Sequence, residues 1–290
     1  MSKVQIQIVT WNSRAHLERL FLGIEKQTGV DFSVVVIDNA STDGTVKWLG
    51  QNFNVVSSLA RNPLYNDINK NKGPLPNVEA TKDVVLIKNQ TNRGFAAAHN
   101  QGLAVCQAPY VLALNPDTEL QAGYLEEVLR VIESDSKVAS VQGKLYRELP
   151  EGEKYGIIDS CGLKMKSWGE VVDIGQNQLD TGNFETHDHP QPLLGKGGDI
   201  FGATGACALY RLEALKSVQD KHGIFDERFG SYKEDVDLAW RLQRAGWKAV
   251  FTPRAVAWHG RGVGRGDKRS WRIRFLSWRN QVLMLIKNLL

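Results

Sequence analysis

Several short stretches of this 290-residue sequence combine carboxylates and amides in ways that could perform chemistry. In residues 114–120, LNPDTEL, an apolar run ends on Asn115 and Asp117. A carboxylate at the end of a strand often holds a ligand or a metal ion. The alternative is a simple turn, because Asn-Pro and Asp are common turn residues and Asp117 could cap the next helix. The heptad alone is compatible with both interpretations.

The stretch IDNASTDGT at 37–45 repeats this arrangement after a second apolar run. Asp38 ends that run, and its carboxylate could accept the ring N–H of a uracil or thymine. The alternative is again structural, with Asp38 and Ser41 forming a turn and Asp43 capping the helix that follows.

Residues 89–103, NQTNRGFAAAHNQGL, bring Asn92 and Arg93 directly before a helix rich in small residues. A helix N-terminus and a guanidinium group together favour an anion such as a phosphate. The run of small residues is also compatible with nothing more than a tightly packed helix.

A fourth group of polar residues lies in the second half of the chain. Glu234, Asp235 and Asp237 begin an amphipathic helix. The helix dipole favours acidic residues there without any function. Carboxylates bunched beside a cleft can, however, raise one another's pKa, which suits a general base. His259, within AWHGRG at 257–262, follows a strand pattern and could join Asp117 around a divalent cation.

The elements that must position these residues alternate between strand and helix patterns. This order, with short loops, predicts an α/β fold with a mostly parallel sheet flanked by helices, and ligands of such sheets bind at the carboxyl ends of the strands. The expected strands of the first half are 4–9, 33–37, 83–88, 110–114 and 137–141, and the expected helices are 13–27, 45–51, 95–106 and 121–134. The less regular second half should contain strands over 203–210 and 247–252 and a helix over 234–245, and residues 57–82 and 176–200 are expected to be long loops.

The composition, with 42% hydrophobic and 23% charged residues, is ordinary for a soluble globular protein. Cys106, Cys161 and Cys207 form no CxxC pair, which disfavours a disulfide framework or a zinc knuckle. No secretory signal and no membrane-spanning run is expected. The absence of G-x-G-x-x-G after the first strand and of G-x-x-x-x-G-K-[ST] disfavours a dinucleotide-binding enzyme and a P-loop enzyme.

Positive charge is concentrated at the C-terminus. Residues 254–290 contain nine Lys or Arg and one acid, whereas residues 1–253 contain 27 bases and 31 acids. The same region has an apolar stripe at helical spacing, formed by Trp271, Phe275, Trp278, Val282, Leu285 and Leu289. A basic, Trp-rich amphipathic helix over 268–290 is typical of contact with an anionic membrane surface. A helix docked on the catalytic domain and a dimer interface are the alternatives, and no nucleic-acid-binding module is recognisable.

These motifs, taken in order along the chain, resemble the inverting glycosyltransferases of family 2, and among them the bacterial rhamnosyltransferase-like branch. The resemblance extends from residues 9–12 to residues 258–262. Its motifs are VTWN, IDNASTDGT, NRGFAAAHNQG, LNPDTEL, GATGACALYR, FDERF and KEDVDLAWRLQRAGW. It implies a GT-A fold in residues 1–265, with a Rossmann-like nucleotide-sugar-binding half (1–142), an acceptor-binding half (143–265) and a C-terminal amphipathic helix (266–290).

The resemblance also implies roles for individual residues. Asp117 and His259 would bind Mg²⁺ or Mn²⁺, and Asp235, with Glu234 beside it, would be the general base. Asp38 would read the pyrimidine edge. The other nucleotide-binding candidates are Thr10, Asn12, Asn92, Arg93 and Asn115. The usual Asp-x-Asp is here Asn115-Pro116-Asp117, which provides one carboxylate fewer for a metal ion.

The implied activity is inverting transfer of one sugar from a nucleotide-diphosphate donor, with dTDP-L-rhamnose as the best guess. The acceptor would be a hydroxyl of a glycan or of a lipid-linked, polyprenyl-diphosphate acceptor in bacterial surface polysaccharide synthesis. The Gln-x-x-Arg-Trp signature of processive synthases is absent. The expected location is cytoplasmic, at the inner face of the cell membrane. The alternatives are a UDP-hexose donor (glucose, galactose or N-acetylglucosamine) and an inactive nucleotide-sugar-binding or scaffold protein.

Overall fold

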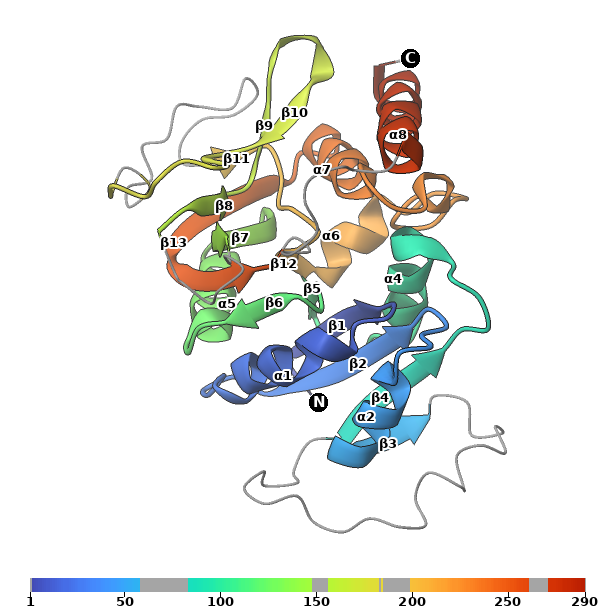
Figure 1. Ribbon diagram of the computed structural model, residues 1–290. Coiled ribbons are helices and arrows are strands. Elements are labelled where there is room, and N and C mark those ends of the chain that lie inside the picture. Colours follow the sequence, from blue (N-terminus) through green and yellow to red (C-terminus); the bar gives the residue numbers. More distant parts are fainter. Residues whose placement is uncertain are drawn as a thin grey trace.

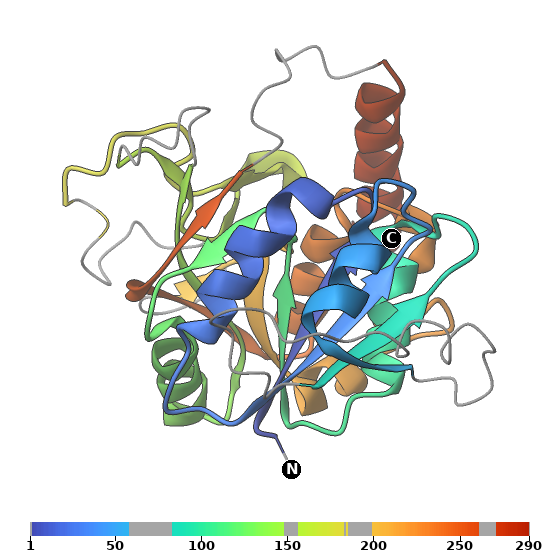
Figure 2. The same cartoon turned by 60° about the horizontal axis from the view of Figure 1, so that its bottom comes forward.

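The computed structural model describes residues 2–57, 83–147, 156–182, 184, 199–260 and 271–289 (Figure 1). Within these residues, a central 11-stranded sheet has the main order β11-β13-β7-β12-β5-β1-β2-β4-β3, with β6 beside β13 and β8 beside β7. Helices cover both faces of this sheet (Figures 1 and 2).

The first half of the chain forms the parallel part of the sheet. Its strands are β1 (Val4–Thr10), β2 (Phe32–Asp38), β3 (Asn54–Ser57), β4 (Asp83–Lys88) and β5 (Tyr110–Leu114). Strands β2 and β5 are nearly continuous apolar runs because helices bury them on both sides, whereas β1 alternates apolar residues with the buried Gln5 and Gln7. The helices are α1 (Leu17–Glu25), α2 (Thr45–Asn52), α4 (Gly94–Ala104) and α5 (Tyr124–Ser134), with a 3-10 turn η1 (Arg14–His16) before α1.

Two hydrophobic clusters fill the space between sheet and helices. One cluster joins α1 and α5 to one face of the sheet through residues such as Leu20, Leu125 and Ile8. The other joins α4 and α7 to the opposite face through residues such as Leu103 and Leu238. The predicted mixed α/β architecture of GT-A type is confirmed.

The second half completes the sheet with mixed strand directions. Strand β12 runs antiparallel to its neighbours β5 and β7, whereas β13 runs parallel to β7. The strands are β6 (Thr118–Leu120), β7 (Val138–Arg147), β8 (Ile158–Ser160), β11 (Asp199–Ile200), β12 (Cys207–Arg211) and β13 (Lys248–His259), and a separate ribbon consists of β9 (Leu163–Met165) and β10 (Val171–Asp173). The helices are α6 (Leu212–Ser217), α7 (Glu234–Arg244) and α8 (Trp271–Leu289), with 3-10 turns η2 (Ser167–Gly169) and η3 (Glu227–Phe229).

Several elements differ from the sequence-based expectations. The short strands β3 and β6 were not predicted. Strand β6 lies between Asp117 and the expected helix over 121–134, where the sequence had suggested that Asp117 could cap the helix directly. That helix begins only at Tyr124, after Gly123 with a left-handed φ of 81°. The last strand extends to His259 because an irregularity between Thr252 and Val256, beside Pro253, lets β13 continue along β7. A proline within a strand pattern conceals such a continuation.

The C-terminal helix α8 packs on α7 through a face that includes Leu285 but not the other residues of the predicted apolar stripe. Met284 is fully buried at this contact, with Leu283 and Leu285 packed beside it. In contrast, Trp271 (72%), Phe275 (55%) and Trp278 (63%) are exposed. Val282, Ile286 and Leu289 are exposed as well. Figure 2 shows α8, in dark red, projecting from the rest of the molecule.

The predicted role of 268–290 in membrane contact concerns this exposed face. Residues 261–270, which include the start of this predicted helix, lie outside the described residues. Within the described part of the chain, none of the helices has the length and apolar composition needed to span a bilayer. The division into halves at 142 and 143, which falls inside β7, stays a prediction.

Candidate active site

The predicted nucleotide-binding residues begin at the carboxyl ends of β1 and β2. Thr10 and Asp38 lie opposite each other in the parallel register of these strands. The Thr10 hydroxyl donates to Asp38 Oδ1 at 3.0 Å, and the backbone N–H of Ser41 donates to Oδ2 at 3.0 Å. Asp38 is only 2% exposed. Its carboxylate therefore organises the turn after β2 as well as lying at the predicted ligand-binding edge.

Asn12 belongs to the same corner. Its Oδ1 accepts a hydrogen bond of 2.8 Å from the backbone N–H of Thr42, and its backbone N–H donates to the Ser41 hydroxyl at 2.8 Å. The left-handed φ of 51° at Asn12 is a conformation that asparagine tolerates better than most residues. Asn12 thereby joins the loop after β1 to the loop after β2.

Asn39, which the sequence reasoning did not single out, connects β2 to the stretch before α4. Its Nδ2 donates to the carbonyl oxygen of Gly94 at 3.1 Å, and its Oδ1 accepts from Asn89 Nδ2 at 2.9 Å. Asn92 Oδ1 accepts the Gly94 N–H at 2.9 Å, and Arg93 is exposed at the N-terminus of α4. Both predicted residues therefore lie at the helix terminus, where an anion would be favoured.

The N-terminal turn of α4 contacts the loop that precedes α7 at backbone level. The N–H of Ala96 donates to the carbonyl oxygen of Gly230 at 3.0 Å. A Cβ atom on Gly94, whose φ is +82°, would lie 2.8 Å from that same oxygen. Only glycine combines this φ with this approach. The contact brings the region of Asn92 and Arg93 next to the loop that leads to Glu234 and Asp235.

Asp117 and His259, the two predicted metal ligands, lie side by side. Strand β6 pairs with the end of β13, so that Thr118 is opposite His259. Asp117 Oδ1 is 3.3 Å from His259 Nε2, and Asn115 Nδ2 is 3.4 Å from the same nitrogen. The backbone N–H of Gly260 donates to the carbonyl oxygen of Asp117 at 2.8 Å. The loop after β5 and the end of β13 are thus held together.

The other ring nitrogen of His259 contacts a residue that the sequence did not reveal. His259 Nδ1 is 2.9 Å from Asp159 Oδ2, and both residues are buried. Burial lowers the pKa of His259, but the hydrogen bonds and charges of Asp117 and Asp159 outweigh it and raise this pKa to about 9. Burial raises the pKa of Asp117, but the hydrogen bond and charge of His259 reverse the effect and hold it below its ordinary value.

The chemistry of this donor set fits a divalent cation. A carboxylate oxygen and an imidazole nitrogen only 3.3 Å apart can contact the same ion. Asn115, beside them, has an amide side chain at the same strand end. In the part of the chain that the structure describes, no cluster of three or more His, Cys, Asp or Glu is arranged as a complete metal shell. Water or the ligand would have to supply the remaining coordination positions.

Glu234 and Asp235 begin α7, as predicted. Asp235 Oδ2 accepts the N–H of Gly205 at 3.0 Å, and Lys233 before them has a left-handed φ of 71°. Burial raises the pKa of Asp235, while the Gly205 hydrogen bond opposes the change. Burial and the charge of Asp235 raise the pKa of Glu234 well above its ordinary value. Glu234 Oε2 is buried and has no hydrogen-bond partner among the described residues. Each carboxyl group of this pair therefore releases its proton less readily than a free carboxylic acid.

Gly205 and Ala206 connect the two carboxylate groups of the site. Gly205 donates to Asp235, and the carbonyl oxygen of the next residue, Ala206, accepts the N–H of Asn115 at 2.8 Å. The predicted base and the predicted metal-binding strand end are therefore separated by two residues of one hydrogen-bonded segment. The stretch GATGACALYR, noted in the sequence without a role, contains this segment.

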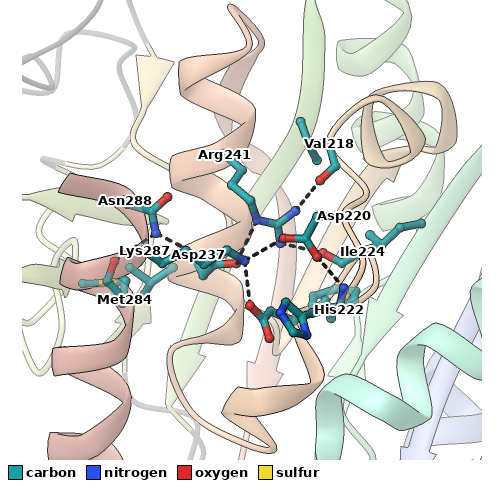
Figure 3. A network of polar contacts seen from close by, with 12 residues as sticks. Val218, Asp220, His222, Ile224, Asp237, Arg241, Met284, Lys287 and Asn288 are labelled. Carbon is teal, nitrogen blue, oxygen red and sulfur yellow. Dashed lines mark hydrogen bonds and ion pairs between the residues drawn. The ribbon is translucent and has the colours of Figure 1, made fainter. Parts of the chain in front are cut away.

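A buried polar network fixes α7 from behind the site (Figure 3). Asp237 accepts from Arg241 Nε at 2.8 Å and from Lys287 Nζ at 3.1 Å, and its Oδ1 accepts from Asn288 Nδ2 at 3.0 Å. Lys287 also contacts Asp226 at 2.7 Å. Lys287 and Asn288 belong to α8, so the C-terminal helix supports the helix that begins with the predicted base.

Comparison with known proteins agrees with this geometry. The family model Glycosyl transferase family 2 matches residues 6–219, and Glycosyl transferase family group 2 matches residues 193–285. A relative from Mycobacterium tuberculosis is named N-acetylglucosaminyl-diphospho-decaprenol L-rhamnosyltransferase. It is 26% identical over 273 residues, which are 89% of this chain and 76% of the relative.

Two solved structures are similar in fold. One is the mannosyltransferase PcManGT of Pyrobaculum calidifontis in complex with GDP-Man and Mn²⁺, with a TM-score of 0.59, 16% identity and coverage of 99% of this chain and 64% of that chain. The other is GalNAc-T7 with UDP, GalNAc and Mn²⁺, with a TM-score of 0.64, 14% identity and coverage of 99% and 48%. The chain thus spans less than two thirds of each structure. The match of the first family model to most of the sequence identifies this chain as a member of glycosyl transferase family 2.

Proposed function

We propose that this protein is an inverting glycosyltransferase that moves one sugar from a nucleotide-diphosphate donor to a hydroxyl of a glycan or lipid-linked acceptor. The observation that carries the proposal is the short connection through Gly205 and Ala206 between Asp235 and the strand end with Asn115 and Asp117. A base so close to an anion-binding edge could deprotonate an acceptor hydroxyl. That hydroxyl could then attack a sugar whose diphosphate is bound at the edge. Family membership supports sugar transfer as the reaction.

Asp235 would take the proton of the acceptor hydroxyl. The hydroxyl oxygen would form a bond to the anomeric carbon on the face opposite the nucleotide, while the bond from that carbon to the diphosphate oxygen breaks. The electron pair leaves with the nucleoside diphosphate, and the configuration inverts in one displacement. The raised pKa of Asp235 strengthens it as a base. The raised pKa of Glu234 favours its neutral form, which would add no second negative charge beside Asp235.

The donor would bind along the carboxyl ends of β1, β2 and β5. Asp38 would read the pyrimidine, and Arg93 at the start of α4 would face the diphosphate. The other residues that we assign to the nucleotide are Thr10, Asn12, Asn92 and Asn115. The best guess for the donor is dTDP-L-rhamnose, since the Mycobacterium tuberculosis relative carries rhamnosyltransferase in its name. A UDP-hexose is the alternative.

Asp117 and His259 would hold Mg²⁺ or Mn²⁺. When bound, the ion acts as a Lewis acid that neutralises charge developing on the leaving diphosphate. The oxygen and imidazole donors fit either ion. Two structures of similar fold contain Mn²⁺ together with a nucleotide or nucleotide sugar.

The exposed face of α8 supports a location at the inner face of the bacterial cell membrane. Exposed Trp271, Phe275 and Trp278 would enter the interface, while exposed Arg274 would meet anionic headgroups. An acceptor linked to a polyprenyl diphosphate would then be reached at the bilayer surface. The name of the Mycobacterium tuberculosis relative includes a diphospho-decaprenol group.

The test is calorimetric titration of the full chain with dTDP, UDP and GDP, each with and without Mn²⁺. We expect metal-dependent binding of dTDP or UDP that is lost in Asp117→Ala. Glu119→Ala, two residues away on β6, is the matched control and should retain binding. Absence of binding by all three nucleotides, in protein with a cooperative thermal transition, would overturn the donor-site assignment and favour the scaffold alternative.

A further inference from the structure

Asp159, on β8, contacts the predicted metal ligand His259 from the side opposite Asp117. The distance from Asp159 Oδ2 to His259 Nδ1 is 2.9 Å, and Asp159 is 2% exposed. Asp159 comes from the irregular middle of the chain, which the motifs of the sequence did not assign to the site. The three side chains lie in the order carboxylate, imidazole, carboxylate.

The strand pairing explains how Asp159 reaches this position. Strand β7 pairs with β8 at Leu145 and Tyr146, and with β13 at Leu145 to Arg147. A strand has two hydrogen-bonding edges, so β8 and β13 flank the end of β7 on either side. Asp159 lies between the residues of β8 that pair there, and His259 is opposite Arg147. Asp159 and His259 are therefore held by a shared strand.

The contacts of the imidazole define the direction of its two nitrogens. Nδ1 points to Asp159, while Nε2 points to Asp117 Oδ1 at 3.3 Å and to Asn115 Nδ2 at 3.4 Å. Because Asp159 holds the proton of Nδ1, a metal ion that displaces the proton of Nε2 would meet the lone pair of Nε2. That lone pair is directed to the same place as the carboxylate of Asp117.

We propose that Asp159 is a positioning residue for the metal site, which orients His259 and fixes the tautomer in which Nε2 can coordinate. This inference rests on the proposed function, because it assumes that Asp117 and His259 hold a divalent cation. With only one carboxylate in the Asn-Pro-Asp stretch, the site depends more on its histidine. Partners of this kind change metal affinity by about 10–100-fold when removed.

The competing interpretation is that Asp159 and His259 form a buried structural pair that binds no metal. Two substitutions separate the interpretations. Asp159→Ala removes the acceptor for Nδ1–H, whereas Asp159→Asn keeps an amide oxygen that can still accept it. Asp180→Ala is the matched control, since Asp180 is a buried aspartate of the same region that pairs with Lys144 at 2.8 Å.

The experiment uses the full chain, loaded with Mn²⁺ alone and with Mn²⁺ plus dTDP, UDP or GDP. Electron paramagnetic resonance of free Mn²⁺ gives the dissociation constant. Electron spin echo envelope modulation reports ¹⁴N coupling from an imidazole bound to Mn²⁺, a signal that a purely structural pair would not affect. Thermal melting and circular dichroism confirm that each variant is folded.

We expect the wild type to show imidazole ¹⁴N modulation that His259→Ala abolishes. In Asp159→Ala the Mn²⁺ affinity should fall about 10–100-fold with weakened modulation, and Asp159→Asn should recover much of both. Wild-type affinity and modulation in both Asp159 variants would overturn the positioning role while leaving the proposed function intact. If Asp159→Ala does not fold, Asp159→Leu, which has the same branching and cannot accept the Nδ1–H, replaces it. Wild-type affinity and modulation in that variant would overturn the role. Absence of imidazole modulation in the wild type would instead overturn the metal site itself, and the inference with it.

Discussion

The side-chain amide of Asn280, on α8, donates a hydrogen bond of 2.7 Å to the backbone carbonyl oxygen of Tyr232. The same amide also reaches the carbonyl oxygens of Phe229 and Ser231, both at 2.9 Å, and Asn280 is fully buried. Tyr232 and Lys233 have left-handed φ values of 74° and 71°, which non-glycine residues adopt only when their surroundings hold them. The C-terminal helix thus fixes the loop that delivers Asp235.

Asn280→Ala should loosen this loop. Three backbone carbonyls would lose a buried donor, and we expect the free energy of unfolding to fall by about 1–3 kcal/mol. Hydrogen exchange of residues 229–233 should accelerate more than that of the sheet. Urea denaturation and exchange mass spectrometry measure the two effects. Val282→Ala, exposed on the same helix, is the control. Wild-type exchange in the loop of Asn280→Ala would contradict the expectation.

Asp235→Asn should separate binding from turnover. The amide cannot take a proton, so the rate should fall by about 10²–10⁴-fold while nucleotide affinity stays near the wild-type value. The rate is measured as release of the nucleoside diphosphate from a sugar donor. The donor contains the nucleotide that calorimetry shows to bind. Glu213→Gln, an exposed acid in the first turn of α6, should keep full activity. Substantial turnover in Asp235→Asn would assign the base to another group.

Glu234→Gln should change how stability depends on pH. The pKa of Glu234 in the folded protein lies above its ordinary value of 4.5, so the folded state binds more protons than the unfolded state between these two values. Stability of the wild type therefore decreases as pH rises through that window. The variant has no carboxyl group to ionise, so we expect it to be more stable than the wild type above the window and nearly equal to it below pH 4.5.

Urea denaturation at a series of pH values measures the difference between Glu234→Gln and the wild type. Glu213→Gln, the same substitution at an exposed acid in the first turn of α6, again provides the control. A constant difference across the whole pH range would show that the substitution acts through packing and not through the ionisation of Glu234.

Lys287→Met should destabilise the contact between α7 and α8 seen in Figure 3. Asp226 and Asp237 are fully buried and would each lose one cationic partner. Arg228 and Arg241 remain beside these carboxylates. The free energy of unfolding should therefore fall by about 3 kcal/mol or less, which is the lower end of the range for a broken buried ion pair. Lys166→Met, in an exposed pair with Glu170, should cost less than about 1 kcal/mol.

The pH dependence gives a second check on Lys287→Met. Burial raises the pKa of Asp226, but its hydrogen bonds with Arg228 and Lys287 hold it below the ordinary value of 3.8. The stabilisation is therefore present above pH 3.8 and is lost as pH falls through the lowered folded value. The difference between the variant and the wild type should be large at pH 7 and should shrink below about pH 4.

The exposed face of α8 predicts selective binding to anionic vesicles. The wild type should sediment with phosphatidylglycerol vesicles more than with phosphatidylcholine vesicles. The double substitution Trp271→Ser and Trp278→Ser should weaken binding by about tenfold or more. Leu22→Ser, which changes an exposed apolar residue of α1, is the control. A concentration-dependent dimer that the Trp substitutions abolish, without vesicle binding, would identify the face as a dimer interface instead.

The parts of the site that the sequence predicted are those encoded locally. Asp38 and Asp117 each follow an apolar run and Asp235 opens an amphipathic helix, so the surrounding pattern of ten or so residues reveals them. Asp159 is different, because only the pairing of β8 and β13 on either side of β7 brings it to His259. No spacing in the sequence encodes such a non-local contact.

The C-terminal helix illustrates a second limit. Its apolar stripe suggests a buried face, because amphipathic helices usually turn that face inward. Here the docked face carries Asn280, Lys287 and Asn288, whose polar groups are matched by loop carbonyls and buried carboxylates. The partners of these side chains belong to distant segments, so the sequence indicated a helix but not which side of it is buried.

The contact between Gly94 and Gly230 has a consequence for recombining this protein with its relatives. Backbone meets backbone there, without side chains that could adjust to a new neighbour. A chimera that takes residues before β7 from one parent and the remainder from another would fit only if the first parent has glycine at position 94 and the second places the carbonyl oxygen of position 230 in the same way. Exchange of donor preference by grafting is therefore best attempted with single loops at the strand ends, leaving this junction unaltered.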